Sequence, residues 1–434
     1  MHTRSRRADI LLAAVLVLFI CGCEGGGGGG GGDNHPPEIT SVPITTAVAD
    51  EGYIYEVQAR DEDQDRLTYA LKTYPEGMSI NSESGEIVWV PVYRQVGNHQ
   101  VEVEVRDRSS SASQKFAIRV IPLADGVPFQ RGFTLAAWGA DDYSKPPTSE
   151  TLGQIKVYGT EWVSVVVTWY VDDIHSTTIY PQSWSPTDES VIQAVQTIHS
   201  LGMNAVLKPH IDVMTGDWRG NISFSDEADW QTWFENYNQF LGHYLDLARA
   251  NDVQAVIIGT ELQGTESREA DWRNTISLAR GRFSGLLTYD ANHTSFYNVS
   301  WWDALDFISV SAYFDLTGSS SPTIDELKSA WEPYKKVLRA LSAYFEKDIV
   351  FGEIGYSSRD GTNIHPWQYN PAAPVDLQEQ ADCYEAALET FYNEPWFKGM
   401  YWWARYWDPA LDDNGFDIFN DPAESIVRQW YSGW

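Results

Sequence analysis

Two glutamates end apolar runs in this sequence, and a pair of carboxylates in such places favours acid and base chemistry. Residues 348–356 read D-I-V-F-G-E-I-G-Y and residues 255–262 read A-V-I-I-G-T-E-L, which puts Glu353 and Glu261 at apolar-to-polar boundaries. A short apolar run that ends between glycines is typical of a buried parallel strand. Either glutamate alone could cap a helix or pair with an arginine. Together they predict two carboxylates at the ends of two buried strands.

Such a pair suits the hydrolysis of a glycosidic bond. One carboxylic acid protonates the leaving oxygen, and the second carboxylate works on the opposite side of the anomeric carbon. Carboxyl groups about 5–5.5 Å apart allow direct attack and retention of configuration, whereas a wider gap leaves room for a water and gives inversion. Glu261 and Glu353 must then differ in protonation at neutral pH, through burial of one and hydrogen bonds to the other.

The composition favours a neutral polymer as the partner. The chain has 434 residues, 61 Asp plus Glu and 30 Lys plus Arg, and a formal net charge of -31. This charge repels phosphate backbones, so we expect no nucleic-acid partner. Of the 19 tryptophans, only Trp89 precedes residue 130. Tryptophan serves core packing, but this excess also suits stacking on sugar faces.

The first 34 residues have the layout of an export signal and a tether. Three arginines within residues 4–7 precede an apolar run over 10–20, which is too short to span a membrane. I-C-G-C at 20–23 resembles a bacterial lipobox, which implies a signal peptide over 1–22 and lipidation of Cys23. An ordinary secretory signal is the alternative. Residues 23–34 include eight consecutive glycines and form a flexible tether. We therefore expect a bacterial cell-envelope protein, held at the outer membrane or cell surface only by its lipid anchor.

Residues 35–122 have short alternating apolar segments separated by turn residues, which predict an all-β sandwich. This region resembles bacterial cadherin-like and immunoglobulin-like modules. The matching stretches are P-P at 36–37, D-E-D-Q-D at 61–65, L-T-Y at 67–69, P-E-G-M at 75–78, G-E-I-V-W at 85–89 and V-R-D at 105–107. The acidic run at 61–65 is either a solvated turn or a calcium site. The sandwich carries no catalytic pattern, so we interpret it as a spacer or a binding module.

After a linker at 123–130, residues 131–434 alternate strand and helix patterns. The predicted strands are 132–137, 162–169, 204–210, 254–259, 286–289, 307–312, 349–351 and 399–403. Helical patterns lie between most of them. Eight such alternations predict a (β/α)8 TIM barrel, an α/β fold that follows an N-terminal all-β immunoglobulin-like sandwich.

The carboxyl ends of barrel strands converge on one mouth, so the residues there are candidates for substrate contact. In chain order they are Trp138, Trp169, Tyr170, Lys208, His210, Asp212, Glu261, Asn292, His293, Tyr313, Glu353, Trp402 and Trp403. Aromatic and hydrogen-bonding groups of this kind suit a sugar. We predict that Trp138, Trp169, Lys208, His210, Asp212, Asn292, Tyr313 and Trp402 bind substrate.

Three of these predictions carry a stated alternative. Tyr313 is placed to hydrogen-bond the nucleophile, or it is a core tyrosine. Lys208, His210 and Asp212 share one parity on their strand, so they point the same way, either toward sugar or into structural hydrogen bonds. Trp402 and Trp403 cannot both face inward for the same reason, and we favour Trp402 as the stacking platform.

The barrel resembles the clan A glycoside hydrolases, and more closely glycoside hydrolase family 113, the β-mannanases. The matching stretches are G-F-T at 132–134, W-G at 138–139, T-W-Y at 168–170, L-K-P-H-I-D at 207–212, D-W-R-G at 217–220, I-G-T-E-L at 258–262, W-R at 272–273, L-T-Y at 287–289, D-F-I at 306–308, A-Y-F at 312–314, E-I-G-Y at 353–356 and M-Y-W-W at 400–403. The resemblance implies Glu261 as acid/base and Glu353 as nucleophile. Most of clan A has Asn before the acid, but Thr260 stands here, so the 2-hydroxyl must be recognised elsewhere.

The expected protein is thus a retaining endo-β-1,4-mannanase that acts on a polysaccharide as a monomer. The alternatives are a retaining hydrolase of another β-glycan, such as glucan or xylan, and a non-catalytic glycan-binding lipoprotein. The nine histidines show no metal-ligand spacing, and no phosphate-loop or serine-nucleophile motif occurs, so we expect no required metal or cofactor. Cys383 is expected to be an inert buried thiol.

Overall fold

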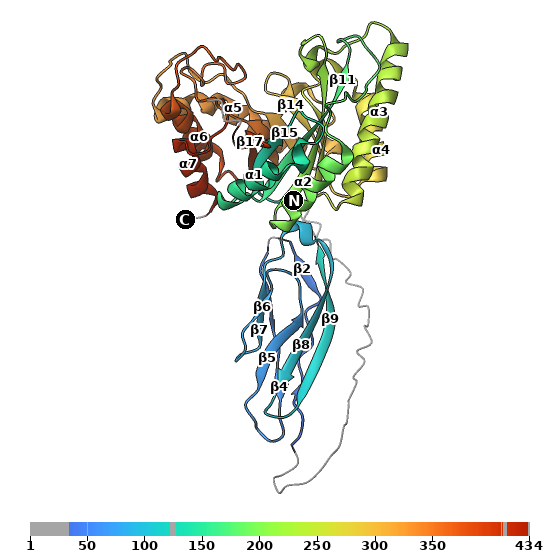
Figure 1. Cartoon of the computed structure of the whole chain (residues 1–434), viewed down its shortest axis with the longest axis vertical. Helices are drawn as coiled ribbons and strands as arrows, with labels where there is room; N and C mark the ends of the chain where they lie inside the picture. Colours follow the sequence, from blue (N-terminus) through green and yellow to red (C-terminus); the bar gives the residue numbers. More distant parts are fainter. Residues whose placement is uncertain (1–33, 50, 122–126, 409, 411–414, 433–434) are drawn as a thin grey trace, which may run out of the picture.

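The computed structural model describes residues 34–49, 51–121, 127–408, 410 and 415–432. The predicted signal peptide, Cys23 and most of the glycine tether lie outside these residues, as do positions 123–126 of the linker. The described chain forms an elongated all-β lobe and a larger barrel lobe (Figure 1). Within the described residues, no helix has both the length and the apolar content needed to cross a bilayer.

The smaller lobe is a β-sandwich, as the short alternating segments predict. One sheet has the order β2 (Thr46–Val48), β9 (Ser111–Ile121), β8 (Gly97–Arg106) and β5 (Thr68–Thr73). The other has the order β3 (Tyr53–Glu56), β7 (Glu86–Trp89) and β6 (Ser79–Ile80), beside a small pair of β1 (Glu38–Ile39) and β4 (Ala59–Arg60). Alternate residues of these strands, such as Tyr55, Ile87, Val103 and Ile118, are buried between the sheets.

The acidic run of the sandwich closes on itself as a turn. The Asp61 carboxylate accepts hydrogen bonds from the backbone N–H groups of Asp63 (2.9 Å) and Asp65 (3.2 Å). Asp63 in turn pairs with His35, at 3.1 Å between Oδ1 and Nδ1. The bond from the Asp63 backbone to Asp61 is an Asx-type turn, in which a side-chain carboxylate replaces a backbone acceptor.

The larger lobe is a closed barrel of eight parallel strands, which confirms the predicted fold class. The strands are β10 (Gln130–Ala136), β11 (Trp162–Val171), β12 (Asn204–Val213), β13 (Ala255–Thr260), β14 (Leu286–Asn292), β15 (Ile308–Ser311), β16 (Ile349–Ile354) and β17 (Phe397–Tyr406). The helices are α1 (Pro146–Val157), α2 (Asp188–Ser200), α3 (Glu227–Ala250), α4 (Glu269–Arg282), α5 (Ile324–Phe345), α6 (Leu377–Phe391) and α7 (Pro422–Tyr431).

Side-chain parity divides the barrel strands into an outer and an inner face. Residues such as Val163, Val165 and Val167 of β11 pack against the surrounding helices. Residues of the opposite parity, among them Trp162 and Tyr401, fill the lower interior with other apolar side chains. Higher in the barrel the interior becomes polar, with Lys208, Asp290 and Glu353 buried there. The apolar plug closes the amino-terminal end, so chemistry is confined to the carboxyl-terminal mouth.

The sandwich contacts the amino-terminal end of the barrel. The Tyr93 ring lies 5.8 Å from the ring of Trp162, the first residue of β11. The Arg94 backbone N–H donates to Asn204 Oδ1 at 3.1 Å, at the first residue of β12. The contact is therefore opposite the carboxyl ends of the strands, and the sandwich cannot line the mouth from there (Figure 1).

Candidate active site

Glu353 lies on β16 in a buried cluster of charges. Its side chain is 7% exposed, and Oε1 accepts a hydrogen bond from Lys208 Nζ at 2.5 Å. Lys208 is fully buried, and it also donates to Asp290 Oδ2 at 2.7 Å and to the Gly352 carbonyl at 3.1 Å. An ammonium group has three N–H donors. All three are engaged by the protein, so Lys208 holds the nucleophile candidate and leaves no donor for a sugar.

Asp290, which the predicted site omits, completes this cluster from β14. Its carboxylate accepts hydrogen bonds from Ser309 Oγ (2.8 Å) and Ser311 Oγ (3.0 Å) on β15, besides the bond from Lys208. Gly352 has no side chain here because an added Cβ would lie 2.4 Å from Asp290 Oδ1. The predicted fifth strand stops at Tyr289. An extension by period two from Thr288 would have indicated that Asp290 and Asn292 also face inward.

The pKa of Glu353 reflects this burial. Burial raises it to about 6; the charge of Lys208 lowers it, and those of Asp290 and Glu261 raise it. Burial also opposes the charge on Lys208, but Asp290 and Glu353 outweigh this effect and raise the Lys208 pKa. Glu353 is therefore ionised above about pH 6, and Lys208 stays charged throughout the neutral range.

Tyr313 contacts the other oxygen of Glu353. Its hydroxyl donates to Oε2 at 3.0 Å, and the side chain is buried just after β15. Burial, followed by the charges of Glu353 and Glu261, raises the Tyr313 pKa well above its usual value, so the phenol remains a donor. Lys208 and Tyr313 thus each hold one oxygen of the same carboxylate.

We expect Tyr313→Phe to lower kcat about 10- to 100-fold, because one hydrogen bond to a charged group is lost. KM should change little if the bond orients Glu353 and does not bind substrate. Tyr237→Phe is the matched control, since its hydroxyl is equally buried but donates to the Ile258 carbonyl. Equal kcat values for the two variants would contradict this role of Tyr313.

Glu261 follows β13 and is held by neighbours on β14. Asn292 Nδ2 donates to Glu261 Oε1 at 2.7 Å, and the Glu261 backbone N–H donates to the Asp290 carbonyl at 2.8 Å. Its φ is +52°, a left-handed conformation that costs a non-glycine residue energy and often marks a functional position. Glu261 directly follows β13, and Glu353 lies near the end of β16 in the same closed parallel barrel, so both glutamates are at its carboxyl-terminal mouth.

A buried glutamate outside the prediction supports the Glu261 loop. Glu266 Oε1 accepts hydrogen bonds from the hydroxyls of Tyr289 (2.9 Å) and Ser295 (3.0 Å). The Tyr289 hydroxyl in turn accepts from the Leu262 backbone N–H at 2.9 Å. Burial raises the pKa of Glu266 to about 7, although the hydrogen bonds from Ser295 and Tyr289 lower it. This network fixes the backbone directly after Glu261.

His210 and Asp212 of β12 meet Arg219, which follows in the next loop. Arg219 Nη1 is 2.8 Å from His210 Nδ1, and Nη2 donates to Asp212 Oδ1 at 2.6 Å. The other ring nitrogen of His210 lies 3.8 Å from Glu353 Oε1. Arg219 belongs to the D-W-R-G stretch at 217–220 but is absent from the predicted substrate contacts. Arg219 was not predicted because it lies in a loop, beyond the end of β12 along the chain.

Trp402 faces away from the mouth, so its prediction as a stacking platform is wrong. It is fully buried and stacks on Tyr384 of α6, with ring centroids 4.0 Å apart. Trp403 has the inward parity, and its ring is parallel to that of His210, with 3° between the planes and 6.4 Å between centroids. Tyr401 occupies the interior, so the inward positions are 401 and 403.

Substitution of Trp402 and of its neighbour Trp403 should have different effects, the first on stability and the second on substrate binding. Trp402→Ala should lower the free energy of unfolding by about 3–5 kcal/mol, because it empties a large buried site. Trp403→Ala should instead raise KM about 10-fold with a small change in Tm, through loss of an aromatic contact with sugar. Denaturant unfolding and steady-state kinetics on the pair separate these outcomes. A large KM increase confined to Trp402→Ala would reverse the assignment.

Trp169 also lies outside the mouth, contrary to the prediction. Its ring packs against Phe240 (5.2 Å) and Tyr244 (6.2 Å) of α3, on the outer face of the barrel. The next residue, Tyr170, has the inward parity, and its hydroxyl accepts a hydrogen bond from Trp184 Nε1 at 3.0 Å. Trp138 is 47% exposed just after β10 and lies 5.8 Å from the Tyr406 ring, where it is open to a ligand.

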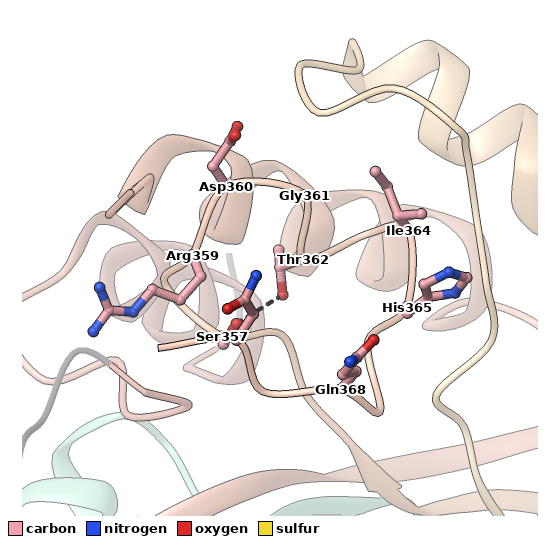
Figure 2. Close-up of a pocket in the computed structure, with 9 residues that line it drawn as sticks. Ser357, Arg359, Asp360, Gly361, Thr362, Ile364, His365 and Gln368 are labelled. Carbon is pink, nitrogen blue, oxygen red and sulfur yellow. Dashed lines mark hydrogen bonds between the residues drawn. The ribbon is translucent and has the colours of Figure 1, made fainter. Parts of the chain in front are cut away.

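The loop after β16 contains a pocket of about 200 Å³ and an acidic cluster. The hydroxyls of Ser357 and Thr362, which are hydrogen-bonded at 3.3 Å, line this pocket together with His365 and Gln368 (Figure 2). Asp360, Asp376 and Glu379 have carboxylate oxygens within 4.8 Å of one another. Glu379, however, accepts hydrogen bonds from the Gly361 and Asn363 backbones, and Asp376 caps α6. Glu379 therefore supports the loop, and Asp376 supports the start of α6. Cys383 on α6 is a buried free cysteine.

A barrel whose polar mouth carries two carboxylates, after the fourth and on the seventh strand, defines the class of protein as a glycoside hydrolase of the (β/α)8 type. The family comparison agrees. The model of Glycoside Hydrolase Family 113 matches residues 132–418, and the model described as "Putative Ig domain" matches residues 36–121. The chain belongs to Glycoside Hydrolase Family 113.

Solved structures give the same result. One described as the complex structure of a GH113 β-1,4-mannanase is 28% identical, with a TM-score of 0.64, and the match covers 71% of this chain and 100% of that one. The GH113 β-mannanase AaManA from Alicyclobacillus acidocaldarius, in complex with ManMIm, is 30% identical, with a TM-score of 0.65 and coverages of 70% and 98%.

A third structure, a β-glucuronidase from Ruminococcus gnavus in complex with uronic isofagomine, matches over 92% of this chain and 68% of its own. At 11% identity and a TM-score of 0.53 it is similar in fold alone. A comparison with curated proteins gave no match.

Proposed function

We propose that the protein is a retaining endo-β-1,4-mannanase, with Glu353 as nucleophile and Glu261 as acid/base. The observation that carries the roles is the contrast between the two carboxylates. Both oxygens of Glu353 are held, by Lys208 and Tyr313, as a fixed nucleophile requires. Glu261 is more open to solvent, and among the described residues its carboxylate has one side-chain hydrogen-bond partner, Asn292. Similarity to two β-mannanases of the family supports the sugar.

The proposed reaction has two displacements. In the first, a Glu353 oxygen attacks the anomeric carbon while Glu261 gives its proton to the leaving glycosidic oxygen, and the carbon–oxygen bond breaks. In the second, Glu261 takes a proton from water, whose oxygen attacks the same carbon and releases Glu353. Two inversions give net retention. The cation of Lys208 favours the carboxylate form of Glu353, which both steps require as attacking or leaving group.

The experiment that tests this function is a screen of defined oligosaccharides. The wild-type protein is incubated with β-1,4-linked manno-, gluco- and xylo-oligosaccharides, and the products are separated by length. We expect cleavage of the manno series at internal bonds. Preferred turnover of the gluco or xylo series would replace mannan by another β-glycan. Glycan binding without new reducing ends in any series would support the non-catalytic alternative.

We also propose that the chain is anchored at the bacterial cell envelope through lipid on Cys23. Support comes from the basic and apolar start of the chain and from I-C-G-C at 20–23. Metabolic labelling with an alkyne fatty acid should label the wild-type protein and not Cys23→Ala. Equal labelling of both proteins, or of neither, would contradict the anchor.

A further inference from the structure

The side-chain amide of Asn292 fits its surroundings in one orientation only. Its oxygen, Oδ1, accepts the backbone N–H of Thr294 at 2.9 Å and the Thr294 hydroxyl at 2.7 Å. A backbone N–H group can only donate, so the amide atom that faces it has to be the oxygen. The amide nitrogen therefore faces Glu261, and Nδ2 donates to Oε1 at 2.7 Å. Asn292 thus presents a donor, and no acceptor, to the proposed acid/base.

This orientation determines where Glu261 can carry a proton. A proton on Oε1 would meet the N–H group of Asn292, and two donors cannot share one hydrogen bond. Among the described residues, Asn292 is the one side-chain hydrogen-bond partner of this carboxylate, so Oε2 is left for a ligand. When Glu261 acts as an acid, its proton is then on Oε2. The O–H bond at Oε2 breaks as the proton passes to the leaving glycosidic oxygen, and the electron pair stays on Glu261.

The backbone after Glu261 is tied to the buried carboxylate of Glu266. Leu262 donates its backbone N–H to the Tyr289 hydroxyl at 2.9 Å, and this hydroxyl donates to Glu266 Oε1, also at 2.9 Å. The direction is fixed, because the backbone N–H can only donate and so takes a lone pair of the hydroxyl. Glu261 needs such support, since its φ of +52° is unfavourable for a residue with a side chain.

The same oxygen of Glu266 is tied to the turn that follows Asn292. Ser295 donates its hydroxyl to Glu266 Oε1 at 3.0 Å and its backbone N–H to the Asn292 carbonyl at 2.9 Å. The backbone carbonyl of Glu266 accepts from Trp301 Nε1 at 3.2 Å, so Glu266 is itself held in place. Burial of a carboxylate costs free energy. A buried carboxylate that holds the two loops around the proposed acid/base is what a site of fixed geometry requires.

We propose that Asn292 leaves Oε2 as the oxygen through which Glu261 transfers its proton, and that Glu266 is the positioning residue that holds this arrangement. The two loops follow β13 and β14, which are neighbouring strands of the barrel, and Glu266 joins them through one acceptor oxygen. The proton transfer rests on the proposed function of Glu261, whereas the hydrogen-bonded link between the loops does not.

Two substrates that differ in their need for a proton test this role. A manno-oligosaccharide has a leaving oxygen that must be protonated, whereas the leaving group of 2,4-dinitrophenyl β-mannobioside departs as an anion. Asn292→Ala and Glu266→Met should lower kcat/KM about 100-fold on the first substrate, because the acid is misplaced. On the second they should lower it less than about 5-fold, because protonation contributes little there. An equal loss on both substrates would overturn the positioning role.

Two variants of nearly unchanged shape test the hydrogen-bond directions. Glu266→Gln keeps an acceptor oxygen for both hydroxyls, so it should retain the wild-type ratio of the two rates. Asn292→Asp turns an acceptor toward Glu261, draws its proton to Oε1 and should be as impaired on the oligosaccharide as Asn292→Ala. The matched control is Glu379→Met, an equally buried glutamate on α6, which should change both rates by the same factor. Full activity of Asn292→Asp, or a Glu266→Gln variant as impaired as Glu266→Met, would overturn the proposal.

The link between the loops is tested without substrate by hydrogen–deuterium exchange of the full chain. The Leu262 amide should exchange about 10-fold faster in Glu266→Met, because its hydrogen-bonded partner is no longer held, and near the wild-type rate in Glu266→Gln. Unchanged exchange in Glu266→Met would overturn the link. Should that variant not fold, Tyr289→Phe removes only the bridge to Leu262 and takes its place. Should the wild type cleave no glycan, the proposed function fails, while the exchange rates still test the link.

Discussion

Glu353→Ala and Glu261→Ala should each lose on the order of 10⁴-fold in kcat on unactivated mannan oligosaccharides, about 5.5 kcal/mol of transition-state stabilisation. The reason differs between them. In the proposed mechanism, no covalent intermediate forms without Glu353, and the leaving oxygen departs without a proton when Glu261 is absent. An aryl substrate with a good leaving group needs little protonation, so it should restore the first step in Glu261→Ala only. Burst kinetics with such a substrate measure this difference.

Azide distinguishes the two roles by stereochemistry. In Glu353→Ala, azide can attack the anomeric carbon from the side that the carboxylate vacated, which gives an α-mannosyl azide. In Glu261→Ala, azide intercepts the intermediate on Glu353 and gives the β-azide. The control is Glu269→Ala, a partly exposed glutamate on α4 that pairs with Arg273, and it should keep wild-type activity. The same azide anomer from both variants would contradict the assignment.

Lys208→Met should lower kcat/KM about 100-fold at pH 6, because it keeps Glu353, the proposed nucleophile, protonated. In the wild type, kcat/KM should rise with pH through about 6 as Glu353 ionises. An adjacent opposite charge lowers a carboxyl pKa by about 1–3 pH units, so loss of Lys208 moves this limb to higher pH. Activity should recover in part on the alkaline side. A pH profile of kcat/KM from 4 to 9 is the measurement.

Asp290→Asn is the control of opposite sign. The charge of Asp290 raises the pKa of Glu353, so its removal should move the acidic limb to lower pH. The double variant Lys208→Met/Asp290→Asn should have a limb between those of the single variants. Removal of one partner from a buried pair costs about 3–5 kcal/mol of stability, so each profile is recorded well below the Tm of that variant. An unmoved limb in Lys208→Met would contradict the role of Lys208.

The barrel and its mouth could be predicted because the sequence pattern indicates the order of the strands and which side chains of each strand share a face. An apolar run followed by a glutamate marks the end of a buried strand, and in a closed parallel barrel all such ends meet at one mouth. The sequence therefore predicts that Glu261 and Glu353 lie at the same mouth, but it does not predict the distance between their carboxylates. The same rule places Lys208 and His210 on one side of β12.

The wrong predictions, Trp169 and Trp402 as substrate contacts, arose where the alternation of inward and outward side chains was not followed to the end of the strand. Trp162 and Tyr170 share the inward parity of β11, so Trp169 packs outward against α3. On β17 the register shifts against both neighbouring strands, so parity counted from the sequence is unreliable there. The place of Tyr401 in the interior and the parallel rings of Trp403 and His210 show that Trp403 faces inward. Arg219 could not be found by parity at all. It lies in a loop, and its role depends on the distance to His210, which only the folded chain provides.

The central claim is that Glu353 forms a covalent bond with the sugar. A 2-deoxy-2-fluoro-β-mannosyl fluoride forms this bond readily but releases it slowly, because fluorine destabilises both transition states while fluoride departs easily. The wild-type protein is inactivated with this reagent, digested and analysed by mass spectrometry. We expect one added 2-fluoromannosyl group, located on Glu353, and no addition to Glu353→Gln. A label on another residue, or turnover to a product of inverted configuration without any label, would contradict the claim.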